Sequence, residues 1–296
     1  MTKKTWLEVA LNGGGGHAHQ HLMPISVDQL IAEGVACVEA GASIVHFHAY
    51  DAATETQKDT ADLYARVIEG IREKVDAIVY GTLPMIGTQD VAGPEHVRER
   101  HAAMLQLAER KLIEWMVVDP GSVNFASVTR LAQDRDGFTY LNPDAHIRHG
   151  LAMCERFALH PSYAVYEPGF MRQATAMAER FPILPTSVYR LMFSEGYTFS
   201  FPPKAYGLDA YLALLEDVAP GAPWMVAGLM VDIHPLIELA VARGGQVRVG
   251  LEDAPRLTER GNLWWVEDAV KRIEAAGGKL ATADDVRRDL GSNSHG

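Results

Sequence analysis

The chain has 296 residues, of which 48% are hydrophobic and 22% charged, and its formal net charge is −11. This length suits one α/β domain of about 250 residues with extensions. The acidic balance argues against nucleic acid or an anionic membrane as a partner, because the sequence offers no basic stripe. It also contains no signal-like apolar region and no run of about 18 apolar residues, so we expect a cytoplasmic protein.

Eight short apolar runs are predicted to be strands, and a helical pattern follows each of them. The strand-like runs cover residues 6–11, 43–48, 77–82, 115–118, 162–166, 184–189, 224–227 and 246–251. The helical patterns cover residues 27–40, 59–74, 94–110, 143–158, 170–180, 208–218, 234–243 and 262–276. Because continuous apolar runs are typical of parallel strands buried on both faces, this alternation predicts an α/β fold.

The number of strand–helix units narrows the architecture. Eight is the count that closes a (β/α)8 TIM barrel. We therefore predict a single TIM-barrel domain over residues 1–296, with a short helical tail at about 282–290. A doubly wound open sheet is the alternative.

Two segments interrupt this rhythm, and both follow predicted strands. Residues 13–16 are four glycines with three histidines soon after them, and residues 194–207 form an aromatic segment rich in glycine and proline. In a barrel both would lie at the carboxyl-terminal face, where active sites are built. The glycine run lacks the spacing of a phosphate-binding motif, so we interpret it as a flexible loop.

The two cysteines, Cys37 and Cys154, lie far apart in predicted helices. Neither belongs to a CxxC motif or stands near candidate ligand residues. We interpret them as buried, reduced side chains rather than as a disulfide or a nucleophile.

A pair of histidines marks the end of the second predicted strand, in the run Val45-His46-Phe47-His48. Side chains alternate along a strand, so His46 and His48 project to one face and the two apolar residues to the other. Two neighbouring imidazoles suit a zinc ion bound through nitrogen. The alternative is a pair of core histidines satisfied by hydrogen bonds.

An acidic pair, Glu252 and Asp253, stands where the eighth predicted strand ends. In a closed barrel the second and eighth strands both flank the first, so Glu252 can approach His46 and His48. Two histidines and a glutamate, with a fourth position open, are typical of a catalytic zinc site. The alternative for the acidic pair is a solvated turn or a helix N-cap.

Blocks of sequence along almost the whole chain resemble the β-keto acid cleavage enzymes, whose best-known member is the 3-keto-5-aminohexanoate cleavage enzyme. The blocks occur in the family's order: residues 10–13 (ALNG), 39–42 (EAGA), 45–48 (VHFH), 121–125 (GSVNF), 165–169 (VYEPG), 224–228 (WMVAG) and 250–253 (GLED). The resemblance implies a zinc-bearing barrel, usually a homotetramer, that uses acetyl-CoA to convert a β-keto acid into acetoacetate and a new acyl-CoA.

The resemblance also implies roles for particular residues. Zinc would lie on His46, His48 and Glu252 and stabilise an enolate, while Asp253 would remove the C2 proton as general base. A serine that ends the third strand in the family aligns near Thr82 or Leu83, and we take Thr82 as a second catalytic candidate. The predicted substrate-binding positions are Asn12, Gly15, Tyr50, Ser122, Asn124 and Val231.

Several of these positions depart from the family pattern. Tyr50 stands where an arginine is usual, and Val231 aligns with an arginine thought to assist catalysis. Gly15 replaces a glutamate that binds the amino group of the type member's substrate, which argues against an amino-keto acid. We therefore expect a different β-keto acid, with carboxylate recognition by Tyr50 or Arg190, or by the loop histidines His17 and His19.

Three other function classes are alternatives to this one. Metal-dependent amidohydrolases carry HxH on the first strand and further ligands on the middle strands, whereas here HxH ends the second. A metal-dependent aldolase would give an aldehyde product. A member that binds a metabolite without turnover would have no physical need for the metal cluster.

Overall fold

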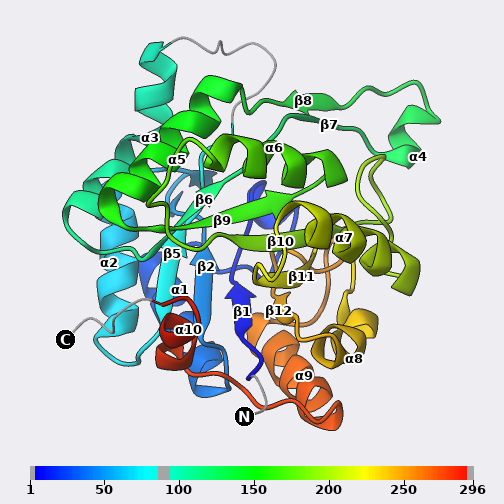
Figure 1. Ribbon diagram of the computed structural model, residues 1–296. Helices are drawn as coiled ribbons and strands as arrows, with labels where there is room; N and C mark the ends of the chain where they lie inside the picture. Colours follow the sequence, from blue (N-terminus) through cyan, green and yellow to red (C-terminus); the bar gives the residue numbers. More distant parts are fainter. Residues whose placement is uncertain (1–3, 86–93, 292–296) are drawn as a thin grey trace.

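The computed structural model describes residues 4–85 and 94–291. Its core is one parallel sheet with the strand order β5-β2-β1-β12-β11-β10-β9-β6. Because β5 and β6, at the two ends of this order, lie next to each other, the sheet curls into a nearly closed barrel (Figure 1). The barrel strands are β1 (Leu7–Ala10), β2 (Ile44–Phe47), β5 (Ile78–Gly81), β6 (Trp115–Val118), β9 (His160–Val165), β10 (Val188–Phe193), β11 (Trp224–Gly228) and β12 (Gln246–Val249).

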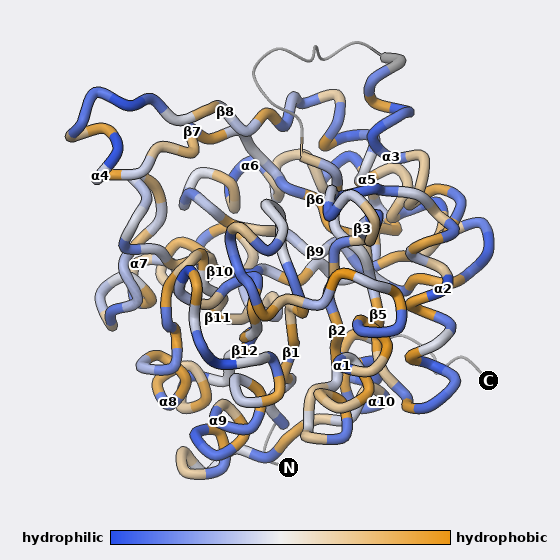
Figure 2. Tube along the Cα trace, turned by 180° about the vertical axis from the view of Figure 1, so that it is seen from behind, coloured by the Kyte–Doolittle hydropathy of each residue, from blue (hydrophilic) through white to orange (hydrophobic). Residues whose placement is uncertain are grey.

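One long helix follows each barrel strand along the chain and packs on the outside of the barrel. These helices are α1 (Val27–Glu39), α2 (Ala61–Arg72), α3 (Pro94–Glu109), α5 (Asp144–Phe157), α6 (Pro168–Ala178), α7 (Ala205–Val218), α8 (His234–Ala242) and α9 (Asn262–Ala275). Figure 2 shows the hydrophobic colour running along β2 and β5, while the connection between α4 and β8 is mostly hydrophilic. The predicted TIM barrel is therefore confirmed, and the open sheet is not formed.

The eight strands and eight helices overlap their predicted ranges, and the largest error is in β10. The prediction placed this strand at residues 184–189, but it spans Val188–Phe193. Pro185 has no N–H to give to a sheet ladder, so residues 184–187 remain a connection. The shift moves Arg190 from the predicted end of the strand into its interior.

Side chains fill the barrel in levels. The lowest level is apolar and contains Trp6, Trp115 and Met225. The short helix α10 (Ala283–Asp289) packs Val286 into the same cluster, and Trp6 Nε1 donates to Asp289 at 2.9 Å. The predicted helical tail therefore lies against the amino-terminal end of the barrel, opposite the functional residues.

Two hairpins at the other end of the barrel were not predicted. The first pairs β3 (Tyr50–Asp51) with β4 (Thr56–Gln57) directly after the HxH segment. The second pairs β7 (Val123–Phe125) with β8 (Phe138–Tyr140) and carries the short helix α4 (Val128–Leu131) at its tip. This second hairpin projects from the barrel as an arm (Figure 1). A single 3-10 turn (Gly16–Ala18) lies in the glycine loop.

None of the helices in residues 4–85 and 94–291 has the length and apolar character needed to cross a bilayer.

Candidate active site

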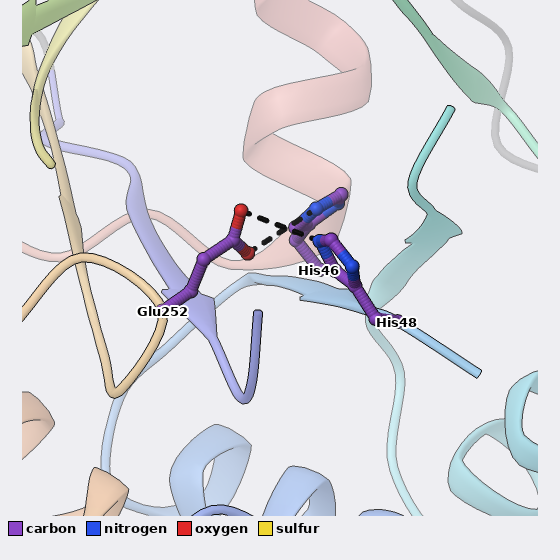
Figure 3. A group of neighbouring side chains, drawn as sticks. All are labelled: His46, His48 and Glu252. Atoms are coloured by element: carbon purple, nitrogen blue, oxygen red, sulfur yellow. Dashed lines mark ion pairs between the residues drawn. The ribbon is translucent and has the colours of Figure 1, made fainter. Parts of the chain in front are cut away.

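Three side chains from two strand ends converge at the carboxyl-terminal face of the barrel. His46 lies in β2, His48 directly follows it, and Glu252 follows β12. β1 separates these strands and pairs with both. His46 Nε2 lies 3.4 Å from Glu252 Oε2, and His48 Nε2 lies 3.4 Å from Glu252 Oε1 (Figure 3). One potential ligand atom from each residue lies within 4.8 Å of the others.

The chemistry of this cluster fits a divalent metal ion. His46 Nδ1, His48 Nε2 and Glu252 Oε2 are buried and have no hydrogen-bond partner among the described residues. Burial lowers the pKa of His46 well below its ordinary value, despite the opposing charge of Glu252. Burial opposes ionisation of Glu252, but Arg248 and the two histidines outweigh it and hold its pKa well below the usual range. A neutral imidazole beside an ionised carboxylate is the state that binds a metal.

A chain of hydrogen bonds fixes the ring of His48. Its Nδ1 lies 3.0 Å from Gln57 Oε1, and since an amide oxygen only accepts, Nδ1 carries the proton. Gln57 Nε2 in turn donates to both oxygens of Asp59, at 3.1 and 3.0 Å. Burial opposes the charged form of His48, but Glu252, Gln57 and Asp59 outweigh it and raise its pKa. This arrangement leaves Nε2 for a metal and orients the ring, as outer partners of metal ligands do.

Arg248, in β12, binds the carboxylates around this cluster. Its Nε and Nη2 donate to the two oxygens of Asp253 at 2.9 and 2.8 Å, and Nη2 also lies 3.1 Å from Glu252 Oε1. Nη1 donates to Glu8 Oε1 at 3.0 Å. Burial raises the pKa of Asp253 to about 6, although Arg248 opposes this. Asp253 is therefore a positioned carboxylate that can take up a proton near neutral pH.

A polar level lies in the barrel beneath the histidines. Tyr80 donates to Glu8 Oε1 at 2.8 Å, and Arg190 Nη2 donates to the backbone oxygen of Ser162 at 3.2 Å. Glu8, Tyr80, Ser162 and Arg190 are all at most 3% exposed. The sequence predicts Arg190 as a candidate ligand of the substrate carboxylate. It lies instead in the middle of β10, and it is absent from the described wall of the pocket above.

A pocket of about 410 Å³ opens beside the histidines and Glu252. One side of its wall is the glycine loop at residues 13–15, with His19 and Gln57. The other side is mostly aromatic and apolar, and comes from the arm and from the loops after β5, β9, β10 and β11. It includes Leu83, Phe125, Phe138, Tyr140, Tyr166, Tyr197, Leu229 and Met230. This space can hold a small organic acid next to the candidate metal ligands.

Two of the predicted substrate and catalytic positions line this pocket directly, Gly15 and Thr82. Gly15 adopts a φ of +96°, and a Cβ there would lie 2.4 Å from the His19 ring. Thr82 is 8% exposed and lies at the mouth of β5. Their roles remain predictions.

The other predicted positions lie outside the described pocket wall. Asn12 donates to the backbone oxygens of Pro24 and His48 and accepts from His48 N at 2.7 Å, so it holds the chain at His48. The Tyr50 hydroxyl donates to Gly13 O and accepts from Gly16 N, so it fixes the glycine loop. Both are structural contacts next to the site, and their predicted part in substrate binding is untested.

Ser122 and Asn124 lie at the base of the arm. Ser122 Oγ accepts from Asn142 N at 2.8 Å, and Asn124 Oδ1 accepts from Thr139 Oγ1 at 2.9 Å. Val231 donates its backbone N–H to Asp253 O at 3.0 Å, so it supports the acidic turn rather than offering a charge. Asp253 itself is 2% exposed and, among the described residues, does not belong to the pocket wall.

Sequence reasoning missed Arg248 and Gln57. Arg248 stands four residues before Glu252 in an otherwise apolar strand, between Val247 and Val249, and a lone arginine there is a signal of a buried ion pair. Gln57 gave no such signal, because its approach to His48 depends on the unpredicted β3–β4 hairpin.

Comparison with known proteins gives whole-length matches. The family model for beta-keto acid cleavage enzyme matches residues 4–291. The 3-oxoadipate:acetyl-CoA acetyltransferase of Cupriavidus necator is 29% identical over 296 residues, covering 98% of this chain and 96% of the relative. The 3-dehydrocarnitine:acetyl-CoA trimethylamine transferase of Rhizobium meliloti is 24% identical over 306 residues, covering 98% and 97%. The 3-keto-5-aminohexanoate cleavage enzyme of Fusobacterium nucleatum is 25% identical, covering 92% of each chain.

Similar solved structures are more distant in sequence. The ternary complex of ObcA with C4-CoA adduct and oxalate has a TM-score of 0.66 at 17% identity, covering 91% of this chain and 67% of that one. The apo form of the homocysteine methyltransferase MmuM from Escherichia coli has a TM-score of 0.55 at 11% identity, covering 91% and 96%. At these identities the similarity shows the fold alone.

Proposed function

Because the chain belongs to the β-keto acid cleavage enzyme family, we propose that it condenses a β-keto acid with acetyl-CoA and releases acetoacetate and a new acyl-CoA. The family consists of acyltransferases, so the chain is an enzyme of this class. The observation that carries the proposal is the convergence of His46, His48 and Glu252 beside a pocket for a small acid.

We propose that the resident metal is Zn²⁺. Two imidazole nitrogens and one carboxylate oxygen are a common ligand set of catalytic zinc sites, which keep a further position open. The buried atoms without hydrogen-bond partners, His48 Nε2 and Glu252 Oε2, support this choice. When bound, zinc supplies a Lewis acid that polarises the oxygens of the keto acid.

The protein's own groups then account for the proton transfer. Asp253 takes a proton from C2 of the keto acid, and Arg248 holds both of its oxygens in place. The resulting carbanion attacks the acetyl carbonyl of acetyl-CoA, forming a carbon–carbon bond and releasing the coenzyme A thiolate. This thiolate attacks the original keto carbon, the bond between that carbon and C2 breaks, and the proton held by Asp253 returns to C2 of the departing acetoacetate.

The remaining residue roles follow from their places around the pocket. Thr82 and Gly15 line it, and Tyr50 and Asn12 hold the loop and the strand end beside it. We propose that the enzyme acts in the cytoplasm as a homo-oligomer, with the tetramer as the state that the family resemblance implies. The relatives act on substrates as different as 3-oxoadipate and 3-dehydrocarnitine, so the keto acid must be identified for this chain itself.

A mass-spectrometric screen tests the proposal. Zinc-loaded protein is incubated with acetyl-CoA and a panel of β-keto acids, and acetoacetate and new acyl-CoA esters are measured. We expect both products from at least one acid, and their loss in Asp253→Asn. Hydrolysis of a lactone or amide without coenzyme A, or an aldehyde product, would instead indicate an amidohydrolase or an aldolase.

A further inference from the structure

Another buried carboxylate, Asp119, stands at the mouth of the barrel, on the side opposite Glu252. It directly follows β6, and in the strand order β6 lies four places from β12 in either direction. Asp119 and Glu252 therefore follow strands on opposite sides of the barrel, and both line the same pocket. A ligand that reaches from one to the other has to be recognised at both ends.

Only one of the two carboxylate oxygens of Asp119 has a hydrogen-bond partner among the described residues. Its Oδ2 accepts a hydrogen bond from the Tyr140 hydroxyl, while its buried Oδ1 has no partner among the described residues. The residue is 5% exposed, and no described lysine, arginine or histidine lies within ion-pair distance of it. Arg190 acts on it only as a more distant charge, and Arg100 reaches it indirectly by donating to the Tyr140 hydroxyl at 3.2 Å. A buried carboxylate oxygen without a hydrogen-bond partner or a neighbouring cation favours a ligand that brings positive charge.

Aromatic rings surround the same end of the pocket. Phe125, Tyr140 and Tyr166 lie in mutual contact, with ring centroids 5.6 to 6.2 Å apart, and Tyr197 packs on Phe125 at 5.4 Å. All four belong to the pocket wall. The faces of such rings attract cations, and aromatic cages are a recurring way to bind quaternary ammonium groups.

From this juxtaposition we propose that the keto acid carries a cationic group, an ammonium or alkylated ammonium, at the end remote from its carboxylate. This differs from the expectation drawn from Gly15, because Asp119 supplies a carboxylate to the pocket from another strand end. The inference rests on the proposed function, which puts the carboxylate and keto oxygens at His46, His48 and Glu252. The cationic end lies among the aromatic rings with Asp119 as its counter-charge. A remote carboxylate is rejected there, because it would face Asp119 with like charge.

Calorimetry on the zinc-loaded protein tests this with a matched set of acids. Three 3-oxo acids of equal length end in a trimethylammonium, a tert-butyl or a carboxylate group. The first two have nearly the same shape and differ in charge. We expect wild-type protein to bind the trimethylammonium acid at least about tenfold more tightly than the tert-butyl acid, and the dicarboxylate most weakly.

Two variants assign the preference to its residue. Asp119→Asn keeps an acceptor oxygen for the Tyr140 hydroxyl but removes the charge, and we expect it to bring the ratio of the two affinities close to one. Asp136→Asn makes the same charge change on the exposed turn of the arm, outside the described pocket wall, and should leave the ratio as in wild type.

Turnover with acetyl-CoA separates this inference from the proposed function. Selective binding of the cationic acid without acetoacetate formation would remove the proposed function and retain the binding site. Acetoacetate formation without a cationic preference would overturn the inference and retain the function. A wild-type ratio of one or less, a failure to bind any of the acids, or a preference that persists in Asp119→Asn would also overturn the inference. The wild-type ratio does not depend on any variant folding.

Discussion

Arg248 donates two parallel hydrogen bonds to Asp253, from Nε to Oδ2 at 2.9 Å and from Nη2 to Oδ1 at 2.8 Å. The same guanidinium also reaches Glu8 and Glu252. Three carboxylates around one arginine leave this group with a net charge of −2 when all are ionised. A divalent cation on Glu252 would bring the sum to zero, so the metal and the arginine together make this buried cluster electrostatically coherent.

Replacing Arg248 by lysine should disable the general base while keeping a positive charge. A lysine cannot reproduce the two-pronged contact with Asp253, so the carboxylate loses its orientation. We expect kcat/KM to fall about 10²-fold or more, because positioned proton transfer contributes about 10²–10⁴-fold. Steady-state kinetics measure this, with the exposed Arg260→Lys as the matched control. Wild-type kinetics in the lysine variant would show that catalysis does not need the paired hydrogen bonds from Arg248 to Asp253.

Activity should rise with pH through the titration of Asp253. Burial raises the pKa of its carboxyl to about 6. The base must be ionised to take a proton, so below this pH kcat/KM should fall roughly tenfold per unit, and above it the rate should level off. A bound divalent cation favours the ionised form, so the midpoint in the zinc enzyme should lie at or below about 6. A midpoint above neutrality would contradict this assignment.

Removing the metal should lower the stability of the protein, and metal binding should release a proton. A metal at 100 times its Kd adds about 2.7 kcal/mol to the free energy of unfolding, so chelation should lower the Tm. The pKa of His48 is raised, and a metal must displace its proton, so zinc affinity should increase as pH rises. Calorimetry in buffers of different ionisation enthalpy counts the released proton.

Histidine substitutions test where that metal binds. His46→Ala and His48→Ala should each lose it in elemental analysis, whereas the exposed His21→Ala should retain about one per chain. Retention of a full metal complement by either of the first two variants would place the ion elsewhere.

The cluster of His46, His48 and Glu252 could be predicted because two simple rules place it. Alternation along β2 puts both imidazoles on one face, and a closed barrel puts β12 and β2 on either side of β1. Both rules depend only on local pattern and on the number of strands. The same rules explain why the fold itself was predicted correctly from apolar runs and helical periodicity.

The contacts that tune the cluster could not be predicted in the same way. Gln57 meets His48 through a hairpin of two-residue strands, too short to leave a periodic pattern. Asp119 and Tyr140 meet because β7 pairs with β8 and brings Tyr140 next to Val123 at the base of the arm, and that pairing has no signature in either segment alone. The boundary of β10 was predicted wrongly, and this misplaced a side chain. Because the strand begins four residues later than predicted, Arg190 lies inside the barrel rather than at its mouth.

The two cysteines should be inert in the native protein. Burial raises the pKa of Cys37 to about 12, and burial also raises that of Cys154. Thiolates are the reactive form of cysteine. At pH 8 an aromatic disulfide reagent that releases a coloured thiolate should therefore react with neither residue on the minute timescale. In denaturant both should react, giving about two thiols per chain. Rapid reaction of one thiol before unfolding would show that its segment opens.

The glycine loop should control metal affinity through one residue. A Cβ on Gly13 would lie 2.8 Å from Glu252 Cγ, so Gly13→Ala must push Glu252 away from the imidazoles. A Cβ on Gly14 would meet nothing closer than Gln57 Oε1 at 4.0 Å, so Gly14→Ala is a matched control with the same added methyl group. We expect Gly13→Ala to weaken zinc binding about tenfold or more in chelator competition, in line with other changes that disturb ligand orientation. Unfolding temperatures of both variants in excess chelator measure the strain that does not depend on the metal, because the added Cβ would also lie 3.3 Å from Glu252 Cβ and 3.4 Å from its Cα. Equal zinc affinities in the two variants would mean that the position of Glu252 is not set by this loop.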